Sequence, residues 1–274
     1  IMSSDWSSDV CSSDLGETWN ESIEMRDSAT GRPRRRLTSA GIYNTTPTYH
    51  YNSAFSADSR YLVFATAREG RSAIMRAEVA TGDLTVLAAG SGFGEYKRMD
   101  QRLPWAPGEH GLGGFTGGNL ALVPRSGVAV AVVPDRILAI EVETGATRVL
   151  CDAVPLAVDY RVPGGNASGD KVYIPRRPSH PDLIAGRDRP RQVYKQAVHA
   201  ERGGIPVEIE EFDLTSGARR IVYQEEVAGS NHVLPSPTDD DLLLIDRDLP
   251  PTYEYYGDHC VTPRAHLLRM STGA

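Results

Sequence analysis

The sequence has 274 residues, of which 40% are hydrophobic, and its formal net charge is −7 at pH 7. A mildly acidic chain that lacks a basic stripe interleaved with aromatic residues does not favour nucleic-acid binding. Its apolar runs all fall well short of the roughly 18 residues that a membrane span requires. We therefore expect no nucleic-acid partner and no membrane partner.

The chain begins IMSSDWSSDVCSSDL, which is rich in Ser and Asp and has neither helical nor strand periodicity. Back-translated, Asp5–Leu15 resembles a sequencing-library adapter read in one frame. We expect residues 1–15 to be a non-native, disordered segment and residues 16–274 to form a single domain truncated at its C-terminus. We expect a cytoplasmic location. A periplasmic location stays open, because any targeting peptide would have preceded Gly16.

The next segments have the form of short strands joined by tight turns. Ile23–Arg26 and Arg34–Thr38 flank a turn at Thr30-Gly31. Further on, the stretch Ser56–Ala88 contains three apolar strands, separated by polar turns, at Tyr61–Ala65, Ile74–Val79 and Leu84–Leu87. This arrangement predicts an antiparallel meander.

The same pattern returns three more times. Its copies cover Val128–Leu150, Lys171–Tyr223 and Ser236–Gly273, and Thr/Ser-Gly turns begin at residues 30, 81, 144, 216 and 272, between 51 and 72 residues apart. One small sheet cannot bury both of its faces, whereas stacked sheets can. We therefore predict an all-β fold, a β-propeller of four-stranded antiparallel blades that holds about four to five of seven blades. An antiparallel sandwich does not explain the recurrent turn.

Two features bear on closure of the ring. Ile23–Thr38 has the form of a piece donated to complete the last blade, and the chain stops at STGA, on a turn where another strand should begin. We expect an incomplete ring whose open blade edges could let the fragment self-associate.

Two runs carry a family resemblance. The first includes YHYNSAFSADSRYLVFATAREG, and the second is TSGARRIVYQEEVAGSNHVLPSPTDDDLLLI (Thr215–Ile245). Together they resemble the oligogalacturonate lyases, seven-bladed propellers related to TolB-like repeats. The second run is the more specific, because the family places a His-Val/Pro-x-x-Pro segment there, followed by an acidic turn and an apolar strand.

The resemblance implies β-elimination on short α-1,4-galacturonides, with an acidic oligosaccharide as the partner. It places His232 as the base that removes the C5 proton, and it implies a divalent metal, Mn²⁺, in the full-length protein. The His and Gln metal ligands are expected beyond residue 274, so the fragment alone could be inactive. Another role for His232 is that of a turn residue ordered by a carbonyl group.

Other candidate substrate-binding residues rest on weaker patterns. The family usually has an arginine where this chain has Pro206–Glu208, and Arg202 is the nearest substitute. Arg247 lies where the family has Cys-His-Glu-Gly-Pro; it could bind a carboxylate or pair with the flanking aspartates. His50 and Tyr51 could reach a central pocket, although aromatic core packing is an equal alternative.

Two other functions remain open. The departures at Pro206–Glu208 and Arg247 favour a noncatalytic TolB-like propeller that binds or scaffolds. The repeat pattern also suits the propeller part of a longer prolyl-oligopeptidase-type peptidase. The basic segment Lys171–Arg202 could gather a polyanionic sugar or be an ordinary solvated loop.

Overall fold

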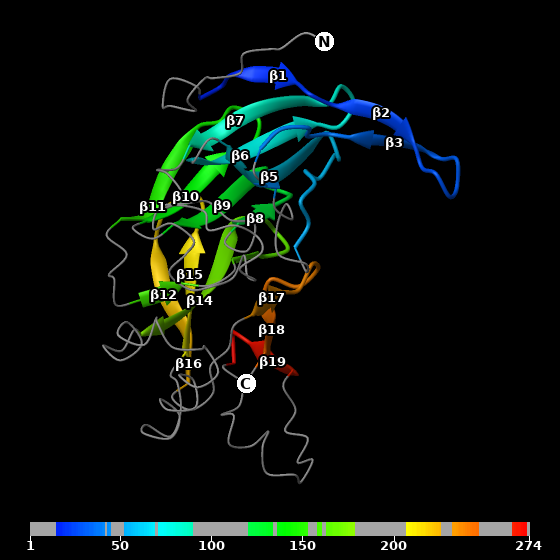
Figure 1. Cartoon of the computed structure of the whole chain (residues 1–274). Helices are drawn as coiled ribbons and strands as arrows, with labels where there is room; N and C mark the ends of the chain where they lie inside the picture. Colours follow the sequence, from blue (N-terminus) through cyan, green and yellow to red (C-terminus); the bar gives the residue numbers. More distant parts are fainter. Residues whose placement is uncertain are drawn as a thin grey trace, which may run out of the picture.

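The computed structural model describes residues 15–41, 43–44, 52–68, 71–89, 120–133, 136–152, 158–160, 163–178, 207–225, 232–246 and 265–272. Every regular element within these ranges is a β-strand, so the all-β prediction is confirmed. Successive antiparallel sheets follow one another along an arc (Figure 1). The chain therefore forms an incomplete β-propeller, as the repeated turns predict.

The first blade contains the predicted meander. Its strands, in chain order, are β4 (Tyr43–Asn44), β5 (Tyr61–Arg68), β6 (Arg71–Glu78) and β7 (Asp83–Ala89), with β1 (Thr18–Asn20) added along β7. β5 is buried on both faces: Val63 faces a core shared with the second blade, and Phe64 faces a core that includes Trp19. Because neither face of this sheet is polar, it needs a neighbour on each side.

The other blades repeat this order. The second contains β8 (Leu120–Val123), β9 (Val128–Val133), β10 (Arg136–Glu141) and β11 (Thr147–Asp152). The third contains β12 (Val158–Tyr160), β13 (Gly164–Gly165), β14 (Lys171–Pro178), β15 (Val207–Asp213) and β16 (Arg219–Glu225). The fourth contains β17 (Val233–Pro235), β18 (Leu242–Asp246) and β19 (Ala265–Arg269). The predicted long strands are confirmed, and the short innermost strands are additions that the pattern did not predict.

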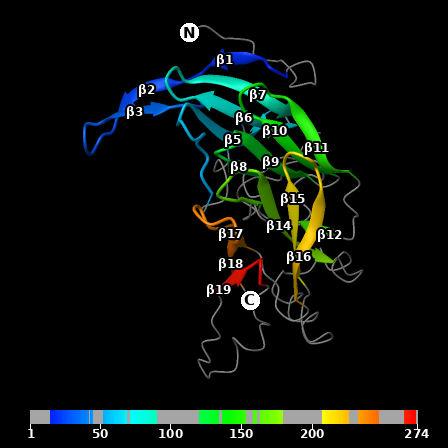
Figure 2. The same cartoon turned by 180° about the vertical axis from the view of Figure 1, so that it is seen from behind.

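A separate hairpin precedes the first blade. It consists of β2 (Ile23–Arg26) and β3 (Pro33–Arg36), which among the described strands pair with each other alone. Figure 2 shows the hairpin extending beyond the first blade. Its predicted role in closing the last blade therefore stays a prediction.

The recurrent turn has one local structure. Gly82 adopts φ +84°, in the left-handed region that glycine tolerates, and its N–H donates to the Glu78 carbonyl over 2.7 Å. The Thr81 hydroxyl accepts the N–H of Asp83 over 3.1 Å. The same glycine conformation and hydroxyl acceptor recur at Thr30–Gly31, Thr144–Gly145 and Ser216–Gly217. The sequence repeats a Thr/Ser-Gly pair because the turn needs both features.

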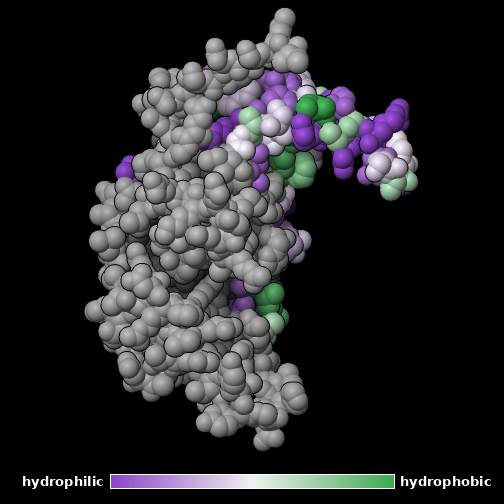
Figure 3. Space-filling view, in the orientation of Figure 1, coloured by the Kyte–Doolittle hydropathy of each residue, from purple (hydrophilic) through white to green (hydrophobic). Residues whose placement is uncertain are grey.

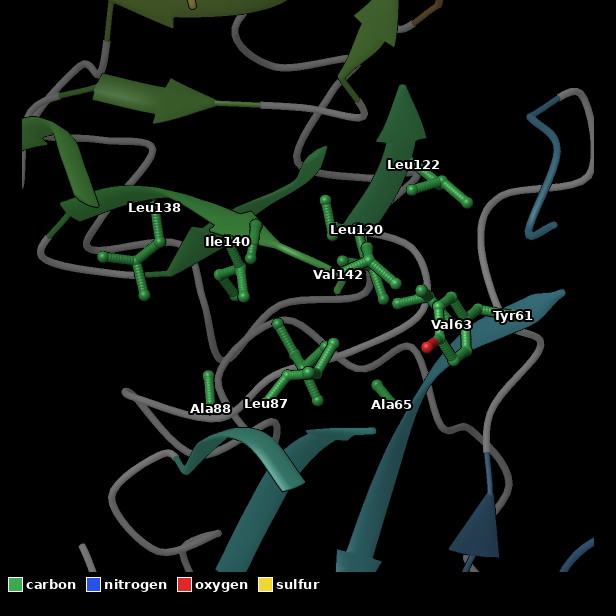
Figure 4. Close-up of a cluster of buried hydrophobic side chains, with 13 residues drawn as sticks. Tyr61, Val63, Ala65, Leu87, Ala88, Leu120, Leu122, Leu138, Ile140 and Val142 are labelled. Atoms are coloured by element: carbon green, nitrogen blue, oxygen red, sulfur yellow. The ribbon is translucent and has the colours of Figure 1, made fainter. Parts of the chain in front are cut away.

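Apolar side chains fill the space between neighbouring blades. Figure 4 shows the core between the first two, where Leu87 and Ala65 from one sheet approach Leu120, Ile140 and Val142 of the other. Similar cores join the second blade to the third and the third to the fourth. Full burial of one such side chain contributes about 1.5–3 kcal/mol, so these cores are the main stabilising contacts of the arc.

Arginines reinforce the junctions at three equivalent places. Arg35 Nη1 donates to the carbonyls of Val79 and Ala80, over 3.0 and 2.7 Å. Arg76 donates to the Val142 carbonyl over 2.6 Å and also to that of Glu143. Arg148 donates to the Thr215 carbonyl over 3.3 Å and also to that of Leu214. In each case the acceptors are the two residues before a Thr/Ser-Gly pair, so each arginine ties its element to the turn of the next blade.

Candidate functional site

The innermost strands of the third and fourth blades lie unusually close together. A Cβ atom on Gly164 would lie 2.6 Å from Pro235 Cδ and 2.9 Å from the Val233 carbonyl oxygen, and one on Gly165 would lie 2.8 Å from both Val123 methyl carbons. Real side chains essentially never make such contacts. The Gly-Gly strand β13 therefore fits between β8 and β17 because it lacks side chains, and it fixes the position of β17.

A polar contact joins this region to the first blade. Asn52 Nδ2 donates to the Pro163 carbonyl over 2.9 Å, although the two residues are 111 positions apart in sequence. Pro163 immediately precedes Gly164, so segments of three blades meet next to β17. This convergence places His232, which immediately precedes β17, at the inner part of the arc, where propeller sites are formed by the loops of several blades.

His232 immediately precedes β17 and pairs with Asp246, the last residue of β18. Its Nδ1 lies 2.7 Å from Asp246 Oδ2, and the Asp246 N–H donates to the His232 carbonyl over 3.2 Å. The two side chains are 26% and 23% exposed, respectively. His232 is thus held by a hydrogen bond to its ring and by another to its backbone carbonyl, and part of its side chain still faces solvent.

This arrangement can support proton transfer. When Nδ1–H donates to the carboxylate, Nε2 carries the lone pair that accepts a proton from a substrate. The carboxylate then stabilises the imidazolium that forms and keeps the ring in a single orientation. The pair therefore has the elements of a general base with its orienting group.

Four predicted site residues lie outside the described residues: His50, Tyr51, Arg202 and Arg247. Their roles stay predictions. The residue that the sequence analysis missed is Asp246 in the role of partner to His232. The signal that could have found it is the antiparallel pairing of Val233 with Ile245, which places His232 opposite Asp246, but this pairing requires β17, a strand that the sequence did not predict.

A guanidinium lies beside the position where the family resemblance leads one to expect an arginine. Arg176 on β14 is opposite Glu208 on β15; its Nε donates to Glu208 Oε2 over 2.6 Å and its Nη1 to Glu210 Oε2 over 3.1 Å. This arginine already engages two carboxylates. Lys171 and Arg176 also belong to a strand that runs to Pro178, so the basic segment begins in the sheet and not in a loop.

A second buried carboxylate, Glu211, faces the fourth blade. It accepts hydrogen bonds from the Tyr173 hydroxyl over 3.1 Å and from Arg220 Nε over 2.8 Å. Burial and the adjacent Glu211 carboxylate raise the pKa of Tyr173 above its ordinary value. The phenol therefore stays protonated near neutral pH, and we assign this cluster a structural role.

The described residues do not fit a metal centre. Among them, no group of three or more His, Cys, Asp or Glu side chains could hold a metal ion. We therefore derive no chemical step through a metal from these residues. Within the same part of the chain, no helix is long and apolar enough to cross a membrane.

The fold and the His232–Asp246 pair define a β-propeller with a candidate proton-transfer site at its inner end. No family model and no curated protein matches the chain. It is similar to the solved structure of an oligogalacturonate lyase in complex with manganese, with a TM-score of 0.68 and 17% identity over 95% of this chain and 60% of that one.

Two further solved structures also match the chain. The oligogalacturonate lyase from Vibrio parahaemolyticus has a TM-score of 0.62 and 16% identity, over 86% of this chain and 55% of that one. TolB from Acinetobacter baumannii has a TM-score of 0.48 and 11% identity, over 92% and 47%. The chain thus spans 55% to 60% of the length of the two lyases. At these identities the likeness to the lyases establishes the fold.

Proposed function

We propose that this chain is part of an enzyme that cleaves short oligogalacturonides by β-elimination. The observation that carries the proposal is the His232–Asp246 pair, 2.7 Å apart at the inner end of a blade. The fold-level likeness to two oligogalacturonate lyases supports it. So does the sequence segment around His232, which resembles the lyase family at the position of its base.

The proposed reaction begins when His232 Nε2 takes the proton from C5 of the uronate. The electron pair of the C5–H bond then forms the C4–C5 double bond, and the bond from C4 to O4 breaks. O4 leaves with the second sugar and gains a proton from solvent or from a nearby acid. Asp246 acts as a positioning residue, because its contact with Nδ1 directs Nε2 towards the substrate.

Turnover and binding should be measured together on the complete protein of which this chain is proposed to be a part, because the expected metal ligands lie beyond residue 274. Trigalacturonate is supplied with and without manganese, formation of the unsaturated uronate is followed by ultraviolet absorbance, and binding is measured by calorimetry. We expect His232→Ala to lower kcat/KM by about 10²–10⁴-fold, the usual contribution of a general base. Asp246→Asn should lower kcat more than it changes KM, since it disturbs orientation and not substrate contact.

His266→Ala is the matched control. His266 lies in the same sheet, opposite Ile245, whose side chain faces the core shared with the third blade. The His266→Ala variant should leave turnover unchanged. If His232→Ala retains full activity, His232 is not the base. Saturable binding of trigalacturonate without product would instead favour a noncatalytic TolB-like binding protein, and the absence of both would overturn the proposal.

A further inference from the structure

One side-chain hydrogen bond crosses from the first blade to the third. Asn52 Nδ2 donates to the Pro163 carbonyl over 2.9 Å, although the second blade stands between the two in the arc. Pro163 is buried, and a buried backbone carbonyl requires a donor. The amide of Asn52 supplies one, so β13, which begins at the next residue, is held from outside its own blade.

The segment that carries Asn52 is fixed to the first blade. The Val63 N–H on β5 donates to the Ala54 carbonyl over 2.9 Å, and Phe55 forms a β-bridge with Leu62. In both Figure 1 and Figure 2 the light-blue chain that precedes β5 runs from the first blade towards the orange strand β17. In Figure 3 this part of the chain lies at the surface, between the first blade above and the fourth sheet below. Asn52 therefore reaches β13 from a segment that is anchored to β5.

On its other side, β13 lies against β17. A Cβ atom on Gly164 would lie 2.6 Å from Pro235 Cδ and 2.9 Å from the Val233 carbonyl oxygen. Close-packed atoms transmit a displacement to their neighbours, so a shift of β13 is passed on to β17. His232 directly precedes Val233 in the chain. The position of β13 therefore affects the position of the imidazole.

The strand β13 has little else to fix it. It consists of two glycines, and it pairs with β14 through Gly164 opposite Tyr173 and Gly165 opposite Val172. Glycine brings no side-chain contacts and gives the backbone more freedom than any other residue. A hydrogen bond at the start of so short a strand therefore contributes much to its placement.

We propose that Asn52 is a positioning residue for the His232–Asp246 pair. Its amide holds the Pro163 carbonyl, this contact fixes β13, and β13 fixes β17 and with it the imidazole. The inference rests on the proposed function, in which His232 is the base. Without a donor at residue 52 the buried carbonyl loses this partner, the inner strands gain freedom, and the contact between His232 Nδ1 and Asp246 is held less firmly.

Proton NMR of the complete protein tests the positioning without reference to turnover. A histidine Nδ1 proton that is shared with a carboxylate in a short hydrogen bond gives a far-downfield resonance, and its absence from the His232→Ala spectrum assigns it. Asn52→Asp keeps the size of the side chain but removes the donor. We expect this variant to lose most of the resonance. Asn52→Ala, which removes the donor without adding a charge, should show the same loss.

Turnover of trigalacturonate by the complete protein provides the second readout. Asn52→Asp should lower kcat by about 10- to 100-fold and change KM little, because a misplaced base slows the proton transfer more than it weakens substrate binding. Asn44→Asp is the matched control, since it makes the same change of charge in the same blade. The Asn44 amide donates over 3.2 Å to the Ala40 carbonyl, four residues away. We expect Asn44→Asp to keep both kcat and the downfield resonance.

The possible results separate this inference from the proposed function. A folded Asn52→Asp protein that keeps the resonance overturns the inference, and so do equal losses in Asn52→Asp and Asn44→Asp. If Asn52→Asp does not fold, Asn52→Ala decides by the same two measurements. An unmodified protein without turnover overturns the proposed function, and the resonance then decides whether Asn52 positions the pair.

Discussion

Replacing Gly164 by alanine tests whether the close approach of β13 and β17 is required for folding. The new Cβ would lie 2.6 Å from Pro235 Cδ and 2.9 Å from the Val233 carbonyl oxygen. Ordinary carbon contacts are about 3.5–4.0 Å, so β17 must move away by close to 1 Å, or the two inner strands must separate. Val233 is adjacent to His232, so the movement also reaches the candidate base.

The expected cost follows from two opposing effects. Gly164 is not among the glycines with positive φ, so alanine fits its backbone. Loss of glycine's freedom in the unfolded chain then stabilises the protein by about 0.4–1 kcal/mol. Overpacking costs about 1–3 kcal/mol and exceeds this gain. We expect a net loss of about 1–2 kcal/mol in the free energy of unfolding.

Urea unfolding followed by tryptophan fluorescence measures this loss, with an unchanged m-value as the check that the unfolding transition is comparable. Pro235→Ala removes the Cδ atom of the nearest contact, so the double variant should recover part of the stability in a double-mutant cycle. A Gly164→Ala protein as stable as the unmodified chain would show that the inner strands do not need this approach.

Two further predictions concern the turns and the core. Hydrogen bonds from the Ser216 backbone and side chain and the Thr215 backbone lower the pKa of Asp213 in the fold, so the stabilisation they provide is present above its unfolded pKa and is lost as pH falls through the folded value. Asp213→Asn should therefore lose less stability on acidification than the unmodified chain, as measured by urea midpoints at neutral and acid pH; equal losses would contradict this. Ile140→Ala, at a fully buried position between two blades, should cost about 2–5 kcal/mol, whereas Ile221→Ala, 38% exposed on β16, should cost much less; similar unfolding midpoints for the two would show that the inter-blade core is not the main stabilising contact.

The blades were predictable because their turns repeat a local requirement. A Thr or Ser hydroxyl that accepts a nearby N–H, followed by a glycine at positive φ, is visible in the sequence whatever the surrounding loops contain. The long strands beside each turn carry enough apolar residues to be recognised. This is why β5–β7, β9–β11 and β14–β16 follow the expected pattern.

The inner strands and the site were harder to predict. β13 is Gly-Gly, which has no strand signal. It forms a strand by pairing with β14, and its residues are glycines because the neighbouring blades leave no space for side chains. β17 has three residues and ends at Pro235, and a proline lowers the strand propensity of so short a segment. Without β17, the register that brings Asp246 to His232 could not be assigned, so the base was predicted from family resemblance and its partner was missed.

The three arginine contacts with turn carbonyls imply that junctions and turns respond differently to acid. A guanidinium keeps its proton throughout the accessible pH range, and a backbone carbonyl has no proton to gain in that range. The turns at Asp27, Asp83 and Asp213, by contrast, rely on carboxylates whose hydrogen bonds lower their pKa. As pH falls, these three turns should lose stability while the arginine contacts between neighbouring elements persist. Acid would therefore weaken individual turns before it separates the blades.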